Sequence, residues 1–257
     1  MPTPSTPATI HHTLSPTFSI PNAAGLRWGG ALYVAAIVQY FLAQVVVATA
    51  WRPAYNWFDN YISDLGNTAC GPFTVPHGAP AYVCSPMHAM MNASFVLAGI
   101  LTIAGTVLLF RFWPRRRMST IALALLLVAG LGKILVGFAP ENGNVALHLL
   151  GAMNLPATSV AILLLSITIR HAHTPLTVTG GIVAVVGLVG TVLSTVGQYA
   201  GPALYLGVGA GGMERLAGYP SNLWMLLIGI LALTQNRTYD ESSNTDDDHT
   251  IMATATP

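Results

Sequence analysis

Charged residues are scarce in this chain. Only 7% of its 257 residues are Asp, Glu, Lys or Arg, whereas 53% are hydrophobic. Soluble domains carry about a quarter charged residues, so this composition argues against a soluble domain and is typical of a membrane protein. With a formal net charge of +1, the chain has no bulk electrostatic attraction for nucleic acid. The cations are nine Arg and a single Lys, a bias that fits a GC-rich genome and favours a bacterial cell membrane.

The chain also lacks the motifs of soluble cofactor enzymes. It has no GxGxxG motif after a strand, no P-loop and no CxxC pair. The Gly-rich run at 207–212 lies between apolar segments, where a flexible outer turn explains it. No cationic n-region precedes the first apolar segment, so we expect that segment to remain as a span and not to be removed as a signal peptide.

Long hydrophobic runs, in contrast, are abundant. A helix needs about 20 apolar residues to cross the hydrocarbon core, and six such segments predict an all-α, polytopic bundle of six transmembrane helices. The segments are Leu26–Ala50, Pro86–Phe110, Met118–Phe138, Leu147–Ile169, Thr177–Tyr199 and Leu216–Thr234. The bundle would occupy residues 25–235, between a disordered tail at 1–24 and a disordered acidic tail at 236–257.

The arginines predict the orientation of this bundle. If the N-terminus is cytoplasmic, the cytoplasmic side collects Arg27, Arg111, Arg115, Arg116, Arg117, Arg170 and Arg237. The opposite side then keeps only Arg52 and Arg215, with Lys133 inside a span. Because cytoplasmic loops carry the excess of cations, both termini are predicted to be cytoplasmic.

The longest connection, residues 51–85, then faces the extracytoplasmic side and contains both cysteines, Cys70 and Cys84. That compartment permits oxidation, so the pair predicts a disulfide, with two unpaired thiols as the alternative. Within the same loop, the aromatic and aliphatic side chains of residues 55–65 are compatible with a short amphipathic helix at the headgroup level.

Polar side chains gather at the outer end of the predicted bundle, although ionisable groups in a membrane are costly and often functional. They are Ser63 and Asp64 in the first outer loop, His88 and Asn92 in the second span, Lys133 in the third, Glu141 in the turn after it, His148 and Asn154 in the fourth, Gln198 and Tyr199 in the fifth, and Glu214 and Arg215 in the sixth. The inner half has few such residues. We therefore expect a polar cavity in the outer third.

The side chains of this cluster suggest roles. A desolvated Asp64 or Glu141 could act as a general base, and His88 or His148 as an acid or base. Lys133 and Arg215 could hold an anionic group. The remaining candidate ligand-binding residues are Ser63, Asn92, Asn154 and Glu214.

Plainer interpretations stay open for the same residues. Lys133 could snorkel or pair with Glu141 or Asp64, the pair Glu214–Arg215 could be solvated, and each His could be structural. Ser63 could be a nucleophile, but a cap is the simpler interpretation. Asp64, His88 and His148 could together bind zinc, but no spacing motif joins them, so no cofactor is predicted.

Several short motifs recur in order at this outer face. They are Tyr61–Gly66 (YISDLG), Ser85-Pro86 with Asn92 after it, Gly137–Glu141 (GFAPE) with His148 downstream, and Glu214-Arg215 before a Trp-containing span. In this order they resemble the DUF998 family of six-span membrane proteins, over about residues 25–235. The resemblance implies a fold and no established reaction. The ISDLG stretch is also similar to the Frag1/DRAM/Sfk1 membrane proteins, some of which are linked to lipid-anchor remodelling, which favours a lipid.

Three functions follow as hypotheses. The first is an extracytoplasmic site that binds or modifies a membrane lipid or lipid-linked molecule. The second is a non-catalytic scaffold or sensor, in which the loop with the cysteines contacts a protein partner. The third is a small-solute transporter, against which the scarcity of charge at mid-depth in the later spans counts.

Overall fold

The computed structural model describes residues 23–75, 78 and 80–253, with side chains described as far as residue 234. Six of its helical segments are long and apolar enough to cross a membrane, which confirms the predicted six-span, all-α fold. The helices are α1 (Ala23–Thr49), α2 (His88–Leu109), α3 (Arg117–Phe138), α4 (Val145–Ala152), α5 (Asn154–Ile169), α6 (Thr174–Ala200) and α7 (Gly209–Ala253). Helices α4 and α5 together make the fourth span.

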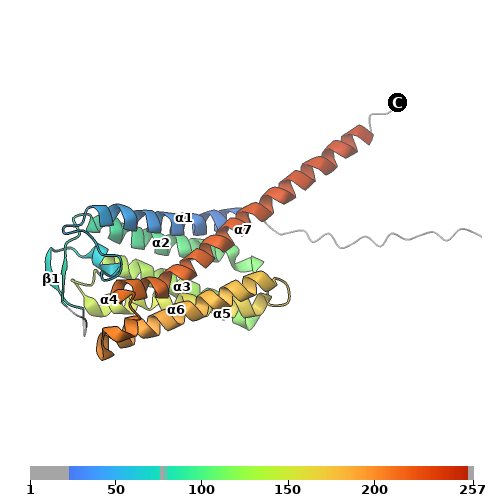
Figure 1. The fold of residues 1–257 in the computed structure, drawn as a ribbon. Helices are drawn as coiled ribbons and strands as arrows, with labels where there is room; N and C mark the ends of the chain where they lie inside the picture. The colour runs from blue at the N-terminus through green and yellow to red at the C-terminus, as the bar shows by residue number, and fades with distance from the viewer. Residues whose placement is uncertain (1–22, 76–77, 79, 254–257) are drawn as a thin grey trace, which may run out of the picture.

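The spans form a closed ring in the order of the sequence (Figure 1). Each span packs against the next, and α7 returns to pack against α1. The outer loop and its two short strands cap one end of this ring, while the α2–α3 and α5–α6 connections lie at the other (Figure 1). That second end carries the arginine-rich connection Arg111–Arg117, so it is the end predicted to be cytoplasmic.

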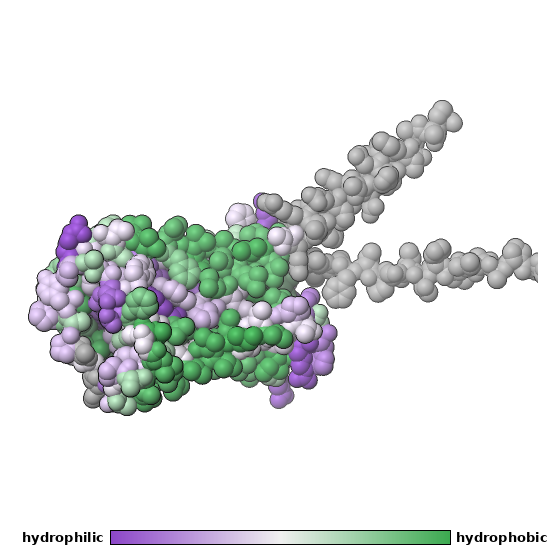
Figure 2. Space-filling model, in the orientation of Figure 1, coloured by the Kyte–Doolittle hydropathy of each residue, from purple (hydrophilic) through white to green (hydrophobic). Residues whose placement is uncertain are grey.

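The outer surface of the ring suits a lipid environment. Figure 2 shows a broad hydrophobic band along the bundle between more polar ends. Large apolar side chains such as Val107, Ile182 and Val189 are half exposed there. In water such a surface would be unfavourable, but lipid tails are as apolar as these side chains.

Small residues let the helices approach closely. A Cβ on Gly190 would clash with the backbone at Ala217 of α7, and a Cβ on Gly187 would clash with Ser159 of α5. Gly181, in contrast, faces open space. Close backbone approach at such positions is a main source of helix association in lipid, where packing replaces the hydrophobic effect.

The fourth span is broken where the sequence predicts one continuous helix. Helix α4 ends at Ala152, and α5 begins at Asn154. Pro156 has no N–H to donate to the carbonyl of Ala152, so the regular hydrogen-bond ladder fails there. The side chain of Asn154 instead donates to the carbonyl oxygen of Gly151 (2.8 Å).

The outer loop is tied together by a disulfide between Cys70 and Cys84, as predicted. Two antiparallel strands, β1 (Gly71–Phe73) and β2 (Ala81–Val83), lie just inside it, with Pro72 opposite Tyr82. The amphipathic helix expected at residues 55–65 does not form. Only a 3-10 turn, η1 (Ser63–Gly66), is present, because Tyr55, Ile62 and Leu65 turn into the bundle and are buried.

Removing the disulfide should destabilise the folded protein. The Cys70→Ser variant is expected to lose about 3 kcal/mol of unfolding free energy, the chain-entropy value for a loop of this size. Cys84→Ser and the double variant break the same bond. All three variants should therefore show the same decrease in unfolding temperature when the detergent-solubilised protein is heated. Unchanged unfolding temperatures would contradict this prediction.

The sixth span starts earlier than predicted, at Gly209. The Gly-rich run is thus partly the first turn of α7 and not only a flexible turn. Gly211 packs closely against the outer loop, where a Cβ would overlap the carbonyl of Asn60. Two further 3-10 turns occur, η2 (Phe110–Phe112) and η3 (Pro202–Tyr205). The backbone of α7 continues to Ala253, through most of the predicted acidic tail. The side chains there and residues 1–22 lie outside the described part, so disorder of both tails stays a prediction.

Candidate functional site

The loop segment Tyr61–Gly66 enters the outer end of the ring and is held by α2 on one side and by α7 on the other. On the α2 side, Asn92 Nδ2 donates to the carbonyl of Gly66 (2.9 Å), and Ser85 Oγ donates to the carbonyl of Leu65 (2.6 Å). A Cβ on Gly66 would overlap Asn92 Oδ1, so the motif needs glycine here. These contacts fix the position of the side chains that follow.

Ser63 and His148 form a hydrogen-bonded pair at this position. His148 lies in α4 and is buried, and its Nδ1 is 2.8 Å from the carbonyl oxygen of Ala139. A carbonyl oxygen only accepts, so Nδ1 carries the ring proton and Nε2 presents a lone pair. Ser63 Oγ lies 2.8 Å from Nε2, which is the shorter of its two contacts with an acceptor; the other is with Glu214 Oε1 at 3.4 Å. The pair therefore has the arrangement of a hydroxyl beside a correctly oriented base.

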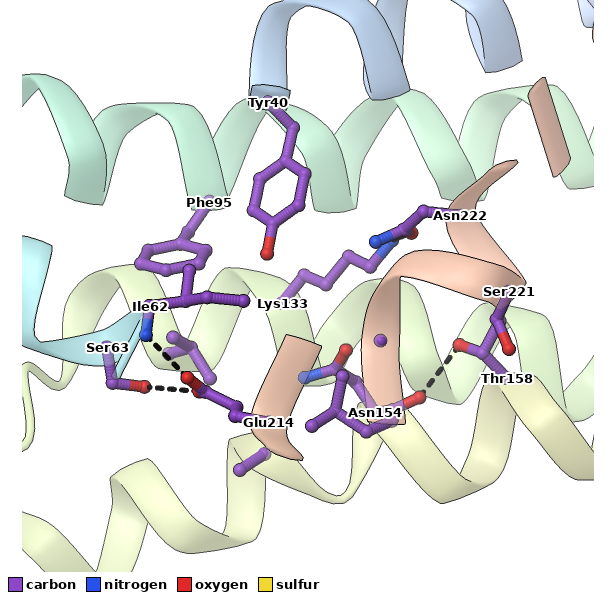
Figure 3. Close-up of a pocket in the computed structure, with 14 residues that line it drawn as sticks. Tyr40, Ile62, Ser63, Phe95, Lys133, Asn154, Thr158, Glu214, Ser221 and Asn222 are labelled. Atoms are coloured by element: carbon purple, nitrogen blue, oxygen red, sulfur yellow. Dashed lines mark hydrogen bonds between the residues drawn. The ribbon is translucent and has the colours of Figure 1, made fainter. Parts of the chain in front are cut away.

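Glu214 of α7 approaches the same serine from the other side. Its Oε1 is 3.4 Å from Ser63 Oγ, and its Oε2 accepts from the backbone N–H of Ile62 (Figure 3). The carboxyl thus clamps the loop segment to α7. Ser63 is held between an imidazole and a carboxyl group.

Asp64 and Glu141 form a second pair, of two buried carboxyl groups that are 3% and 5% exposed. Burial raises the pKa of both. The nearby charge of Asp64 raises the pKa of Glu141 further. Asp64 also accepts from the N–H of Tyr61 (2.8 Å), and Glu141 accepts from Asn67 Nδ2 (3.1 Å).

A cavity of about 260 Å³ lies in front of the Ser63–His148 pair, between α4, α6 and α7. Its polar wall is formed by Ser63, Glu141, His148, Thr191, Ser194, Thr195, Gln198 and Glu214. Its apolar wall comes mainly from Leu149, Met153 and Leu155. Helix α4 packs against α3 but makes almost no contact with α6, so the outer halves of the two helices leave this space between them.

A smaller cavity of about 50 Å³ lies deeper and shares Ser63 and Glu214 with the first (Figure 3). Lys133 and Asn154 line it. Lys133 Nζ donates to Asn222 Oδ1 (3.2 Å) and is not paired with Glu141 or Asp64. The volume suits a few water molecules and not a phosphate-bearing head.

Residues 34–231 match the model of a family described as "Protein of unknown function (DUF998)". The chain belongs to the DUF998 family. The match covers more than half of the chain and contains the lining residues of both cavities, from Tyr40 to Asn222. It confirms the resemblance drawn from the outer-face motifs. No curated protein and no solved structure matches the chain.

In this DUF998 chain Arg215 is an anchor of the outer loop and lines neither cavity. One guanidinium nitrogen donates to the carbonyls of Asn60 (2.9 Å) and Gly211 (2.8 Å), and the other donates to the hydroxyl of Tyr55. The guanidinium carbon also lies 5.0 Å from the ring centroid of Trp57. Arg215 is buried, so a solvated Glu214–Arg215 pair, one of the open interpretations, is not what this DUF998 chain contains.

Two other candidates also lie outside the cavities. His88 is half-buried, and its Nδ1 is bonded to the carbonyl of Ser85 in its own turn (2.9 Å). Asn92 is committed to Gly66. Among the described residues, no group of three or more His, Cys, Asp or Glu side chains is arranged so that it could hold a metal ion. In particular, Asp64, His88 and His148 do not form such a group.

Some residues of the DUF998 site were not singled out as candidates in the sequence. Thr191, Ser194 and Thr195 give α6 a hydroxyl-rich face toward the cavity. Their spacing places them on one side of a helix, and that pattern is the signal that would have found them. Gln198 joins them and donates to Tyr61 Oη (3.3 Å).

Proposed function

We propose that this DUF998 protein binds a membrane lipid, or a lipid-linked molecule, in the 260 Å³ cavity from the outer leaflet. The observation that carries the proposal is the position of this cavity between the separated outer halves of α4 and α6. Leu149 and Met153 line it and are also about half exposed on the surface of the bundle. Acyl chains can therefore follow the apolar wall while the head contacts the polar one.

The polar wall favours a neutral, hydroxyl-bearing head. The described lining residues offer carboxyl, hydroxyl, amide and imidazole groups, whereas Lys133 and Arg215 face elsewhere. A phosphate would meet Glu141 and Glu214 without a cation to offset its charge. A head such as that of a diacylglycerol or a glycolipid would find both donors and acceptors.

A transport function has less support. The inner half of the ring is packed with apolar side chains, among them Ile37, Leu126, Leu165 and Trp224. Transporters usually place their polar site and broken helices near the midplane, whereas here the ionisable groups of the 260 Å³ cavity, Glu141, His148 and Glu214, lie toward the outer end of the bundle. A pure scaffold would have no use for these buried polar groups, which are costly in a membrane. We place the protein in the cell membrane of a bacterium because of its composition.

Photo-crosslinking tests the proposal. The full-length protein is reconstituted in phosphatidylcholine nanodiscs with a diacylglycerol analogue that carries a diazirine on one acyl chain. We expect labelled peptides from α4 and α6, competed by unlabelled diacylglycerol. Ser194→Trp would fill the cavity and should lower labelling at least tenfold, a loss of about 1.4 kcal/mol.

The matched control is Val189→Trp, on the same helix but on its half-exposed outer face. Its labelling should equal that of the unmodified protein. Equal labelling of the Ser194→Trp and Val189→Trp variants, or labelling spread evenly over all six spans, would reject a lipid in this cavity. Stronger labelling by a phosphatidic acid analogue would reject the neutral head.

A further inference from the structure

We infer that Ser63 is the nucleophile and His148 the general base of an acyl-transfer reaction on an ester of the bound lipid. This inference rests on the proposed lipid site and adds a reaction to it. Hydrogen-bond reach between a hydroxyl and an imidazole is the first requirement for an activated serine. Ser63 Oγ and His148 Nε2 meet it at 2.8 Å.

The second requirement is a group that orients the base. In serine hydrolases a third partner bonds Nδ1–H and so leaves Nε2 free to take the proton. Here the carbonyl oxygen of Ala139 does so, at 2.8 Å. Ala139 belongs to the turn after α3 and His148 to α4, so two separate elements hold the imidazole and prevent its rotation.

The third requirement is access of a substrate to the nucleophile. Ser63 and His148 both line the 260 Å³ cavity, with Leu149, Met153 and Leu155 as its apolar wall. An acyl chain on this wall would bring its ester group to the polar side, near Ser63. In this assignment, water enters the same cavity from the extracytoplasmic side.

The reaction then balances with water as the only co-reactant. Ser63 Oγ attacks the ester carbonyl carbon while its proton passes to His148 Nε2. The bond from the carbonyl carbon to the leaving oxygen breaks, and that oxygen takes the proton from His148, which leaves an acyl-serine and a free alcohol. Water, deprotonated by His148, attacks the acyl-serine; the carboxylic acid leaves and Ser63 regains its proton. An acceptor alcohol in place of water would give transfer.

Ester chemistry fits the wall better than phosphoryl transfer. Phosphoryl transfer depends on cationic groups around the phosphate, and Lys133 and Arg215 do not line this cavity. Glu214 acts as a positioning residue, since it holds the backbone of Ile62 next to the nucleophile.

A serine-directed fluorophosphonate probe with an alkyl chain tests the assignment on the full-length protein in nanodiscs. Attack by Ser63 would release fluoride and leave a phosphonylated serine. We expect mass spectrometry to place the adduct on Ser63 of the unmodified protein, a result that needs no variant. Ser63→Ala and His148→Gln should each lower the rate of labelling at least a thousandfold, the scale of loss when a member of such a pair is removed.

Ser119→Ala is the matched control, because this serine is buried near the cytoplasmic end of α3; its labelling should be unchanged. Diazirine labelling by the diacylglycerol analogue is measured on the same samples. If that labelling persists while Ser63 carries no adduct, the acyl-transfer assignment is overturned and the lipid site stands. If diacylglycerol labelling is absent from the unmodified protein as well, the lipid site itself is overturned. An adduct on another residue also overturns the assignment.

Discussion

Arg215→Ala is expected to lower the free energy of unfolding by about 2–3 kcal/mol, the scale of hydrogen bonds between a charged group and neutral partners. Arg215 is 9% exposed; its guanidinium joins α7 to the outer loop through Asn60 and Tyr55 and also donates to Gly211 in its own helix. Hydrogen bonds that involve a charged group contribute more than neutral ones. Loss of the side chain leaves the Asn60 carbonyl and the Tyr55 hydroxyl without this partner. The loop that carries Ser63 should therefore detach from α7 first.

Thermal unfolding of the detergent-solubilised protein measures this effect. Arg215→Lys keeps the charge but cannot reproduce the planar fork, so it should recover only part of the stability. Arg170→Ala serves as the control, because Arg170 is exposed and bonds only its neighbour His171. We expect this control to change stability by less than about 0.5 kcal/mol. An Arg215→Ala variant as stable as the control would show that Arg215 is no anchor.

The stability of the folded protein is expected to fall as the pH rises. Burial and the charge of Asp64 raise the pKa of Glu141 well above its ordinary value of 4.5. A carboxyl whose pKa is higher in the folded than in the unfolded protein contributes stability that is complete below the unfolded value. That stability is lost as the pH rises through the folded pKa. The protein should thus unfold more easily at pH 9 than at pH 5.

Glu141→Gln removes this titration and keeps a neutral donor for Asp64. We expect the variant to match the unmodified protein at pH 4, below the ordinary carboxyl pKa, and to exceed it in stability at pH 9. The difference should be about 1.4 kcal/mol for each unit by which folding raises the pKa. Unfolding temperatures measured across this range give the result. Asp59→Asn, at an exposed carboxyl of the outer loop, is the control substitution, and a Glu141→Gln curve parallel to that of the unmodified protein would refute the raised pKa of Glu141.

The sequence predicts the fold because crossing a membrane is a local requirement. Each span needs a long apolar run, and these runs can be counted without knowledge of their neighbours. The placement of Asp64, Glu141, His148 and Glu214 near one another also follows in part. Loops and helix starts on the same side of the membrane must meet at the same end of a ring. The disulfide was predictable for the same reason, since both cysteines share one loop.

Contacts between particular side chains were not predictable in this way. Ser63 reads as a cap in the sequence, yet it faces His148. Arg215 and His88 look free but are bonded within the protein. These directions depend on the path of the outer loop, which contacts such as Asn92 to Gly66 determine. No periodicity in the chain encodes that path.

The break in the fourth span had a signal that was open to a different interpretation. Asn154 and Pro156 stand two residues apart within an apolar run. Proline in a span can be absorbed by neighbouring helices, and an unbroken helix was therefore the simpler prediction. The structure instead ends one helix and starts another.

The apolar packing of the inner half limits the route that a bound molecule could take through the bundle. Large side chains such as Leu126 and Leu165 occupy the centre of the ring on the cytoplasmic side. If the proposed lipid enters between α4 and α6, this packing leaves it no route to the cytoplasmic side, and it would leave by the same lateral opening. The cavity would then be open to one leaflet only. Its substrate and its product would both stay in the outer leaflet, and neither would be exposed to the cytosol.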